Sequence, residues 1–203
     1  MHDSGGGMGK GQGGADGSDF THHTQSGDMD CGLACLRMVR DWLGLGVPEP
    51  ELRKGWSREK GIDPEPMGLA IASLVGKRAE ELRSRDEVQK LVVEKTSRDK
   101  VQTLVAEQTA NLLSYSEKYL LVLLISYWNE DGNNPRHWII ARNFRVLFNE
   151  FSTKKTKAKS PKQRELVALV HDPLQTWPYR QAWASILAAP VLHGFLLTNP
   201  KAQ

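Results

Sequence analysis

Apolar residues recur at helical spacing in the N-terminal part of the chain. Over 31–45 they fall three and four positions apart, which predicts an amphipathic helix that ends at Gly44. The same reasoning predicts a short helix over 48–60 and another over 63–75. Prolines in the first turn of the last helix are tolerated, because a first-turn N–H has no helical partner.

Further along the chain, the apolar positions are continuous instead of periodic. Residues 119–125 form an unbroken apolar run, which is typical of a buried central strand. Shorter apolar stretches predict strands at 137–142, 165–170 and 194–198, with a short helix around 179–187. Helices followed by an antiparallel meander predict an α+β fold, in which N-terminal helices pack on an antiparallel sheet.

A highly charged segment, 78–113, separates these two regions. Within it, 88–93 fits either a strand or a helix. Residues 97–105 begin with a capping pattern and predict an amphipathic helix. The pattern assigns no function to this segment.

The composition is that of one globular domain with a tail. The chain has 203 residues, of which 39% are hydrophobic and 25% charged, and both values are ordinary for a soluble protein. Residues 1–20 are rich in glycine and poor in apolar side chains, so we predict a disordered tail there and a single domain over 21–200. The formal net charge of +3 is too small to favour a nucleic-acid-binding role.

Cys31 and Cys35 lie four residues apart on the first predicted helix and share one of its faces. Because a disulfide within one helical turn is geometrically awkward, both are predicted to be reduced thiols. Reduced thiols suit a cytoplasmic or nuclear protein. The N-terminal residues contain no secretory apolar region, and the run 119–127 is too short to cross a bilayer. We therefore expect a protein that makes no use of a membrane.

Two further features of the sequence are a basic run and a pair of histidines. The basic run 154–164 predicts a solvated hairpin loop, with an acidic partner or a nuclear address as the alternatives. His22 and His23 have no nearby ligands at metal-binding spacing and predict a solvated loop. We therefore predict no metal ion and no cofactor.

Residues around Cys31 carry the pattern of a thiol nucleophile. A cysteine at the N-terminus of a helix is placed where the helix dipole and the unpaired N–H groups favour a thiolate. Gln25, six residues upstream, is a candidate oxyanion donor together with the backbone N–H of Cys31. A buried structural cysteine is the alternative for Cys31, and it is the better explanation of Cys35.

His137 and Asp172 are the candidate partners of the thiol. His137 opens a predicted strand after a turn-rich approach, which suits a general base at a strand end. His171 and His193 are weaker competitors. Asp172 follows the next predicted strand and could accept a hydrogen bond from the imidazole. The alternative for Asp172 is an ordinary Asp-Pro turn.

The block around Cys31 resembles a known family. It is similar to the guanylyl cyclase domain-containing proteins of eukaryotes through Asp30-Cys31-Gly32-Leu33-Ala34-Cys35, Arg37-Met38-Val39 and Leu43-Gly44. The similarity continues in shorter matches, which are Val92-Val93-Glu94-Lys95, 119–127, His137-Trp138-Ile139-Ile140, Asp172-Pro173 and the terminal strand. It thus covers most of 25–198.

That resemblance implies a papain-like fold shared with the bacteriocin-processing, double-glycine leader cysteine peptidases. It implies Cys31 as nucleophile and His137 as base. It also implies Asp172 as the residue that orients the base, and Gln25 at the oxyanion hole. Arg136 stands where the peptidases tend to have glycine, and the chain has no transporter domain, so the bacterial leader-cleaving role does not carry over.

The predicted function is therefore that of a papain-like thiol hydrolase, a peptidase or isopeptidase with a peptide or protein substrate. The family name implies an alternative, a guanylyl cyclase that makes cyclic GMP from GTP. That reaction normally needs carboxylates that hold metal ions on the phosphates, and the sequence offers neither a convincing pair nor a phosphate-binding glycine loop. A catalytically silent binding module of the same fold is the third alternative, and a Josephin-type deubiquitinase fits the Cys31 block less well.

Overall fold

The computed structural model describes residues 20–76, 79–90, 119–126, 135–149 and 163–198. The helices are α1 (Cys31–Leu43), α2 (Glu49–Leu52), α3 (Pro64–Val75) and α5 (Trp183–Ala188), and residues 85–90 are also helical. The strands are β1 (Trp56–Ser57), β2 (Gly61–Ile62), β3 (Ala79–Leu82), β4 (Tyr119–Ser126), β5 (Arg136–Asn149), β6 (Gln163–His171), β7 (Tyr179–Ala182) and β8 (Val191–Thr198).

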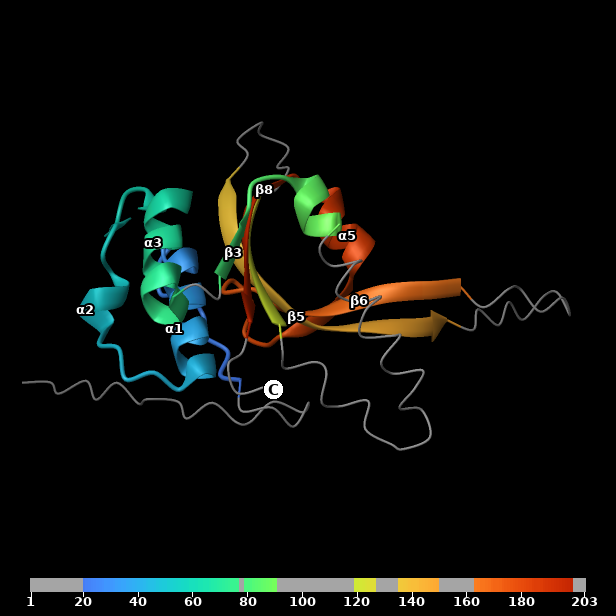
Figure 1. Ribbon diagram of the computed structural model, residues 1–203, viewed down its shortest axis with the longest axis horizontal. Helices are drawn as coiled ribbons and strands as arrows, with labels where there is room; N and C mark the ends of the chain where they lie inside the picture. Colours follow the sequence, from blue (N-terminus) through green and yellow to red (C-terminus); the bar gives the residue numbers. More distant parts are fainter. Residues whose placement is uncertain (1–19, 77–78, 91–118, 127–134, 150–162, 199–203) are drawn as a thin grey trace, which may run out of the picture.

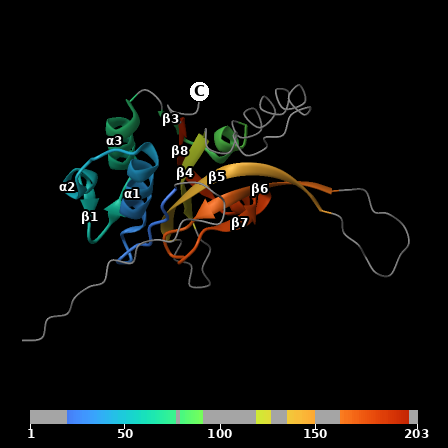
Figure 2. The same ribbon diagram turned by 90° about the horizontal axis from the view of Figure 1, so that it is seen from below.

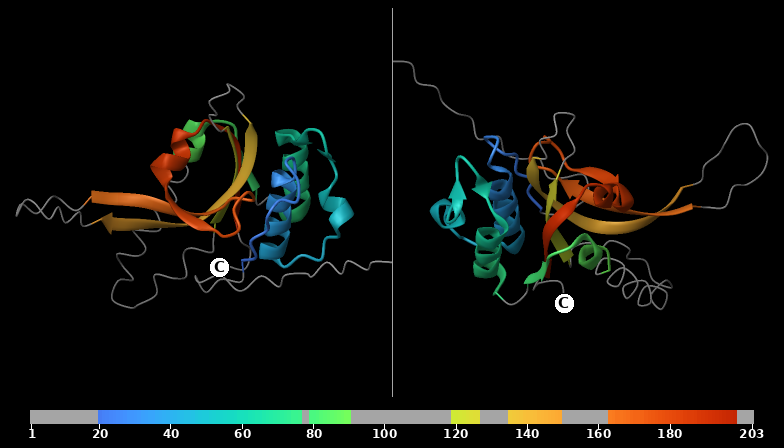
Figure 3. Two further views of the ribbon diagram at one scale, coloured as in Figure 1. Left: turned by 180° about the vertical axis from the view of Figure 1, so that it is seen from behind. Right: turned by 90° about the horizontal axis from the view of Figure 1, so that it is seen from above.

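Six of these strands form one antiparallel sheet in the order β3-β8-β4-β5-β6-β7, while β1 and β2 pair separately as a hairpin. Helices α1, α2 and α3 gather on one side of the sheet, and α5 lies on the other side (Figure 1). The same layers are separated in the views from behind and from above (Figure 3). Helices packed against an antiparallel sheet agree with the predicted α+β class.

Strand β4 lies at the centre of the core, between β5 and β8. Its side chains alternate between the two faces, as the period of a strand requires. Leu120, Val122 and Leu124 belong to the apolar cluster that contains α1 and α3. Leu121, Leu123 and Ile125 belong to a second cluster, which contains α5. The continuous apolar run of this strand is therefore explained by burial on both faces, as predicted.

Strand β5 is longer than the predicted strand 137–142 and contains an irregularity. Its pairing with β6 shifts between Arg142 and Arg145, and Asn143 has a φ of 53° there. Asparagine tolerates this left-handed conformation better than most residues, and an extra residue in one strand bends it locally. The curvature of β5 is visible from below (Figure 2).

The helix predicted over 48–60 is wrong for most of its length. Only Glu49–Leu52 is helical, and the hairpin β1–β2 follows. Gly55 and Gly61 have φ angles of 78° and 71°, which a helix does not contain. A Cβ on Gly55 would lie 2.4 Å from Cβ of Pro66 in α3, so glycine is needed for this close approach.

The helix predicted around 179–187 is shorter than expected. Residues Tyr179–Ala182 form β7, which pairs with β6, and only Trp183–Ala188 is helical. The last strand begins at Val191 and inserts between β3 and β4, so it does not continue the meander. The first departure depends on pairing with β6 across the turn 172–178, and the second on pairing with the distant strands β3 and β4. The local pattern contains neither.

Phe20, at the end of the predicted tail, is buried and belongs to the core. Residues 1–19, the predicted helix 97–105 and most of the basic run 154–164 lie outside the described residues. Of the ambiguous stretch 88–93, residues 88–90 are helical. In the described ranges, no helix combines the length and apolarity needed to cross a membrane.

Gly32, in the first turn of α1, is a point of very close packing. A Cβ at this position would lie 2.1 Å from Cγ2 of Ile62 in β2. It would also lie 3.0 Å from Cδ1 of Trp138 in β5 and 3.1 Å from Cε of Met67 in α3. The absence of a side chain at Gly32 therefore lets the start of α1 approach the hairpin, the sheet and α3 together.

We predict that Gly32→Ala lowers the free energy of unfolding by about 1–3 kcal/mol, although alanine is the better helix former, because overpacking forces the three neighbours apart. Gly46→Ala is the matched control, since a Cβ at Gly46 would meet no atom within 4 Å. Urea unfolding followed by circular dichroism measures both variants. Equal midpoints for the two variants would contradict the packing argument.

Candidate functional site

The candidate nucleophile, Cys31, is the first residue of α1. Asp30 precedes it as the N-cap, and its backbone oxygen accepts a hydrogen bond from Ala34 N at 2.9 Å. The Asp30 carboxylate makes no capping bond and instead accepts a hydrogen bond from Ser26 Oγ. Cys31 thus stands at the positive end of a helix whose first N–H groups are not capped by the preceding side chain.

The hairpin β1–β2 supports the turn that leads into Cys31. Trp56 Nε1 donates to the backbone oxygen of Met29 at 3.1 Å. On the sheet side, Trp138 Nε1 donates to the backbone oxygen of Ile62 at 2.9 Å. These two indole hydrogen bonds connect the segment before Cys31 to the hairpin, and the hairpin to β5.

His137 and Asp172 form a buried hydrogen-bonded pair. His137 Nε2 lies 2.7 Å from Asp172 Oδ1, and the residues are 5% and 3% exposed. His137 lies near the start of β5, and Asp172 directly follows β6, its neighbour in the sheet. Asp172 Oδ1 also accepts a hydrogen bond from the backbone N–H of Leu174 at 2.9 Å, which fixes the carboxylate in a local turn.

The imidazole of His137 also contacts Cys31. Burial disfavours the imidazolium, but hydrogen bonds to Asp172 and Cys31, with the negative charges of both groups, raise the pKa of His137 to about 9. Three residues from α1, β5 and the end of β6 are thereby brought together.

Gln25 lies at the edge of this cluster. Its backbone N–H donates to the backbone oxygen of Pro173 at 2.9 Å, so the segment before Cys31 runs beside the residue after Asp172. Its side-chain Oε1 is buried and has no hydrogen-bond partner among the described residues. The backbone contact places Gln25 near Asp172, while its role as an oxyanion donor stays a prediction.

Cys35 and Cys31 are both unpaired thiols with different surroundings. Cys35 has no exposed surface, whereas Cys31 keeps 7% exposure. Burial, reinforced by the charges of Cys31 and Asp172, raises the pKa of the Cys35 thiol well above its ordinary value. Cys35 therefore packs in the core as expected, and Cys31 is the thiol that faces His137.

His171, the first weaker competitor, lies in a different environment. It is 1% exposed, and its Nε2 accepts a hydrogen bond from Arg142 Nε at 3.0 Å. Phe20 packs on both groups, with its ring centroid 4.4 Å from that of His171 and 4.3 Å from Cζ of Arg142. Burial and the charges of Arg142 and His22 lower the pKa of His171 to about 2, so the ring is neutral at physiological pH.

The other described histidines also have partners. His193, the second competitor, lies on β8 at an ion-pair distance of 2.9 Å from Glu81 of β3. The loop predicted for His22 and His23 is present, but both side chains are half-buried and bonded instead of fully solvated. His22 Nε2 lies 2.8 Å from the backbone oxygen of Gln175, and burial lowers the pKa of His22.

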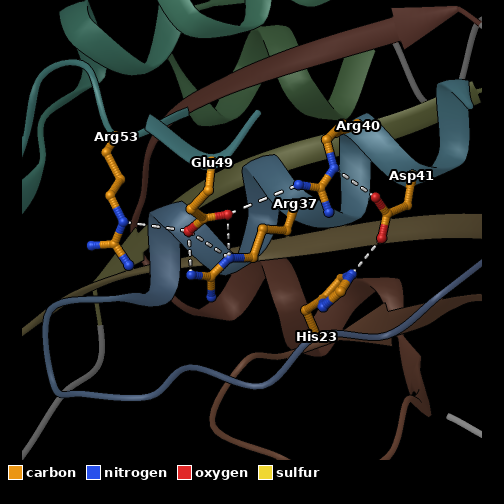
Figure 4. Close-up of polar contacts among 6 residues, drawn as sticks. All are labelled: His23, Arg37, Arg40, Asp41, Glu49 and Arg53. Carbon is orange, nitrogen blue, oxygen red and sulfur yellow. Dashed lines mark hydrogen bonds and ion pairs between the residues drawn. The ribbon is translucent and has the colours of Figure 1, made fainter. Parts of the chain in front are cut away.

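His23 joins a charged network on the outer side of α1 (Figure 4). Its Nε2 lies 2.6 Å from Asp41 Oδ2, and Arg40 Nε donates to the other oxygen of Asp41 at 2.7 Å. Arg37 Nε of α1 donates to Glu49 Oε1 of α2 at 3.0 Å. The network attaches both the segment leading to Gln25 and the helix α2 to α1. It therefore stabilises the position of the first turn of α1.

One contact at this site was not predicted from the sequence. Tyr179, at the start of β7, pairs with Val170 of β6, two residues before Asp172. Burial and the nearby charge of Asp172 raise the pKa of Tyr179. Tyr179 also lines a cavity of about 350 Å³ between the sheet and α5, together with Ile125, Ile139 and Ile186. No sequence signal pointed to Tyr179, because its contact depends on the pairing of β7 with β6.

Among the described residues, no group of three or more His, Cys, Asp or Glu side chains is arranged to hold a metal ion. The chain matches no known protein-family model, and no curated protein sequence shows significant similarity to it. The residues around Cys31 are therefore the only basis for assigning a function.

The two buried histidines predict opposite effects of pH on stability. The folded-state pKa of His171 lies far below its unfolded value of 6.5, so its contribution is complete above pH 6.5 and is lost as the pH falls towards 2. For one proton, the free energy of unfolding drops by about 2 kcal/mol between pH 6.5 and 5. His137 is the reverse case, because its contribution is complete below pH 6.5 and is lost as the pH rises through about 9.

Urea unfolding at several pH values measures both slopes. His171→Gln keeps an acceptor for Arg142 but does not titrate, so we expect a shallower loss of stability on the acid side and an unchanged alkaline side. An acid slope that is identical in this variant and in the wild-type protein would assign the slope to other groups.

Proposed function

We propose that this protein is a thiol hydrolase with a papain-like arrangement, in which Cys31 attacks the carbonyl carbon of a peptide or isopeptide bond. The single observation that carries the proposal is the buried His137–Asp172 hydrogen bond, on an imidazole whose pKa is also raised by the neighbouring Cys31. The three residues combine a nucleophile, a base and a group that orients the base, which is the general pattern of activated nucleophiles.

The electrostatics of the site support a charged thiolate–imidazolium pair. A raised pKa keeps His137 protonated at neutral pH while Cys31 is its neighbour. An imidazolium beside a thiol at a helix N-terminus favours the thiolate, which is the nucleophilic form. Asp172 stabilises the imidazolium and fixes the ring through Nε2.

In the proposed reaction, the Cys31 thiolate forms a bond to the carbonyl carbon, and the carbonyl oxygen becomes an oxyanion. The backbone N–H of Cys31 and the side-chain amide of Gln25 are the proposed donors to that oxyanion. His137 then gives its proton to the amine nitrogen as the C–N bond breaks, which leaves an acyl-enzyme. Next, His137 removes a proton from water, the hydroxide attacks the thioester, and the carboxylic acid product departs with restoration of the thiolate.

The positions of the other site residues are consistent with this proposal. The Leu174 N–H donates to Asp172, so it helps to hold the carboxylate in a fixed orientation. The Gln25 backbone bond to Pro173 brings the proposed oxyanion donor to the same end of the sheet. Such supporting contacts restrict the reacting groups to one geometry.

We predict that iodoacetamide labels wild-type protein once, at Cys31, and that Cys31→Ala abolishes labelling while Cys35→Ala leaves it intact. The physical reason is that Cys35 is fully buried and Cys31 contacts His137. In His137→Gln, we expect Cys31 to be labelled more slowly at pH 6.5 than in the wild-type protein, because the neighbouring imidazolium is removed. Intact-mass spectrometry against time measures these rates.

Labelling of Cys35 alone, or a rate that His137→Gln does not change, would contradict the proposed nucleophile. A wild-type rate equal to that of a free thiol would favour a binding module of the same architecture. Formation of cyclic GMP from GTP by both the wild-type protein and Cys31→Ala would favour the cyclase that the resemblance implies.

A further inference from the structure

Large apolar side chains are exposed on the segments that carry the reacting groups. Met29, two residues before Cys31, is 42% exposed. Leu174 and Trp177, in the loop that follows Asp172, are 56% and 65% exposed. Single exposed apolar side chains are ordinary, but a leucine and a tryptophan three residues apart on the loop that follows Asp172 offer an apolar surface close to the site.

The loop 172–178 is held by several hydrogen bonds, so its apolar side chains are presented in a fixed arrangement. Within the loop, Gln175 N donates to the backbone oxygen of Asp172 at 2.9 Å, in addition to the bond from Leu174 to the Asp172 carboxylate. From outside, Gln25 N bonds to Pro173 O, and His22 Nε2 lies 2.8 Å from Gln175 O. Preorganised apolar side chains lose less entropy when a ligand binds.

The charge and accessibility of the site restrict the ligand class. Between Asp172 and Tyr179, the only charged side chain is Asp172 itself, which is 3% exposed. This composition suits an uncharged ligand better than a phosphate or an acidic peptide. Cys31 and His137 are only 7% and 5% exposed, so a slender chain reaches the sulfur more readily than a folded surface does.

We propose that Leu174 and Trp177 bind large apolar side chains of an extended polypeptide substrate, next to the carbonyl that Cys31 attacks. The inference rests on the proposed function and adds the substrate class to it. Burying one such side chain against an indole changes the specificity constant by about tenfold or more.

The test uses peptidyl acyloxymethyl ketones, which react with Cys31 without turnover. One probe carries Leu-Phe beside the reactive carbonyl, and a second carries Asp-Lys. For the wild-type protein, we expect the Leu-Phe probe to label Cys31 at least about tenfold faster. In Trp177→Ala and in Leu174→Ala, we expect this ratio to fall towards one, while labelling of Trp177→Ala by iodoacetamide keeps its wild-type rate.

Leu69→Ala is the matched control, since Leu69 of α3 is an equally apolar side chain with 69% exposure and should leave the ratio unchanged. A wild-type ratio near one would overturn the inference, and so would a ratio that Trp177→Ala and Leu174→Ala leave unchanged. In either case, iodoacetamide labelling of Cys31 would still support the hydrolase. If iodoacetamide does not label the wild-type protein at Cys31, the proposed function itself is overturned. A mass that increases with concentration in the wild-type protein, but not in Trp177→Ala, would assign the apolar surface to a second copy of the chain.

Discussion

His137 and Asp172 must satisfy each other, because both are buried and each carries a group that is costly to leave without a partner. The pair requires β5 and β6 to be neighbours, with His137 near the start of one strand and Asp172 just past the end of the other. Removing one member of such a pair is far more damaging than replacing both, because an uncompensated buried charge is left behind. The turn after Asp172 adds the backbone N–H of Leu174 as a donor to the same carboxylate.

A second constraint is the close approach of α1 to the sheet. Two consecutive residues of β5 contribute to the two constraints. His137 bonds to Asp172, and Trp138 bonds to the hairpin that supports the segment before Cys31. Gly32 permits this approach because no side chain fits between α1 and Ile62. The candidate site thus lies where the helical layer meets the sheet, and the packing of the core determines the distance between sulfur and imidazole. Chemistry and folding therefore depend on the same few contacts.

The sequence pattern predicted those elements whose signal is local. The helix from Cys31 and the strand 119–125 were recognisable, because one has a clear helical period and the other a continuous apolar run. The hairpin β1–β2, the strand β7 and the insertion of β8 were missed, because each depends on pairing with a distant segment or on the conformation of a glycine. Propensity is a weak guide where tertiary contacts decide the structure.

The candidate site likewise contains residues that the sequence predicted and residues that it did not. Cys31, His137 and Asp172 were chosen for their residue types and their order along the chain, and they lie together in the structure. Tyr179 and the buried cluster of Phe20, Arg142 and His171 were not foreseen, because their contacts follow from strand register and from the path of the N-terminal segment. Residue type suggests a reacting group, whereas its supporting contacts require the fold.

The interaction between His137 and Asp172 is measured most directly by NMR titration of His137, with ¹⁵N-labelled histidine in the wild-type protein and in Asp172→Asn. We predict a pKa of about 9 for His137 in the wild-type protein, and a clearly lower pKa in Asp172→Asn because the carboxylate charge is removed. A wild-type pKa near 6.5 that Asp172→Asn leaves unchanged would contradict the proposed site, since the imidazole would then interact with neither the carboxylate nor the thiol.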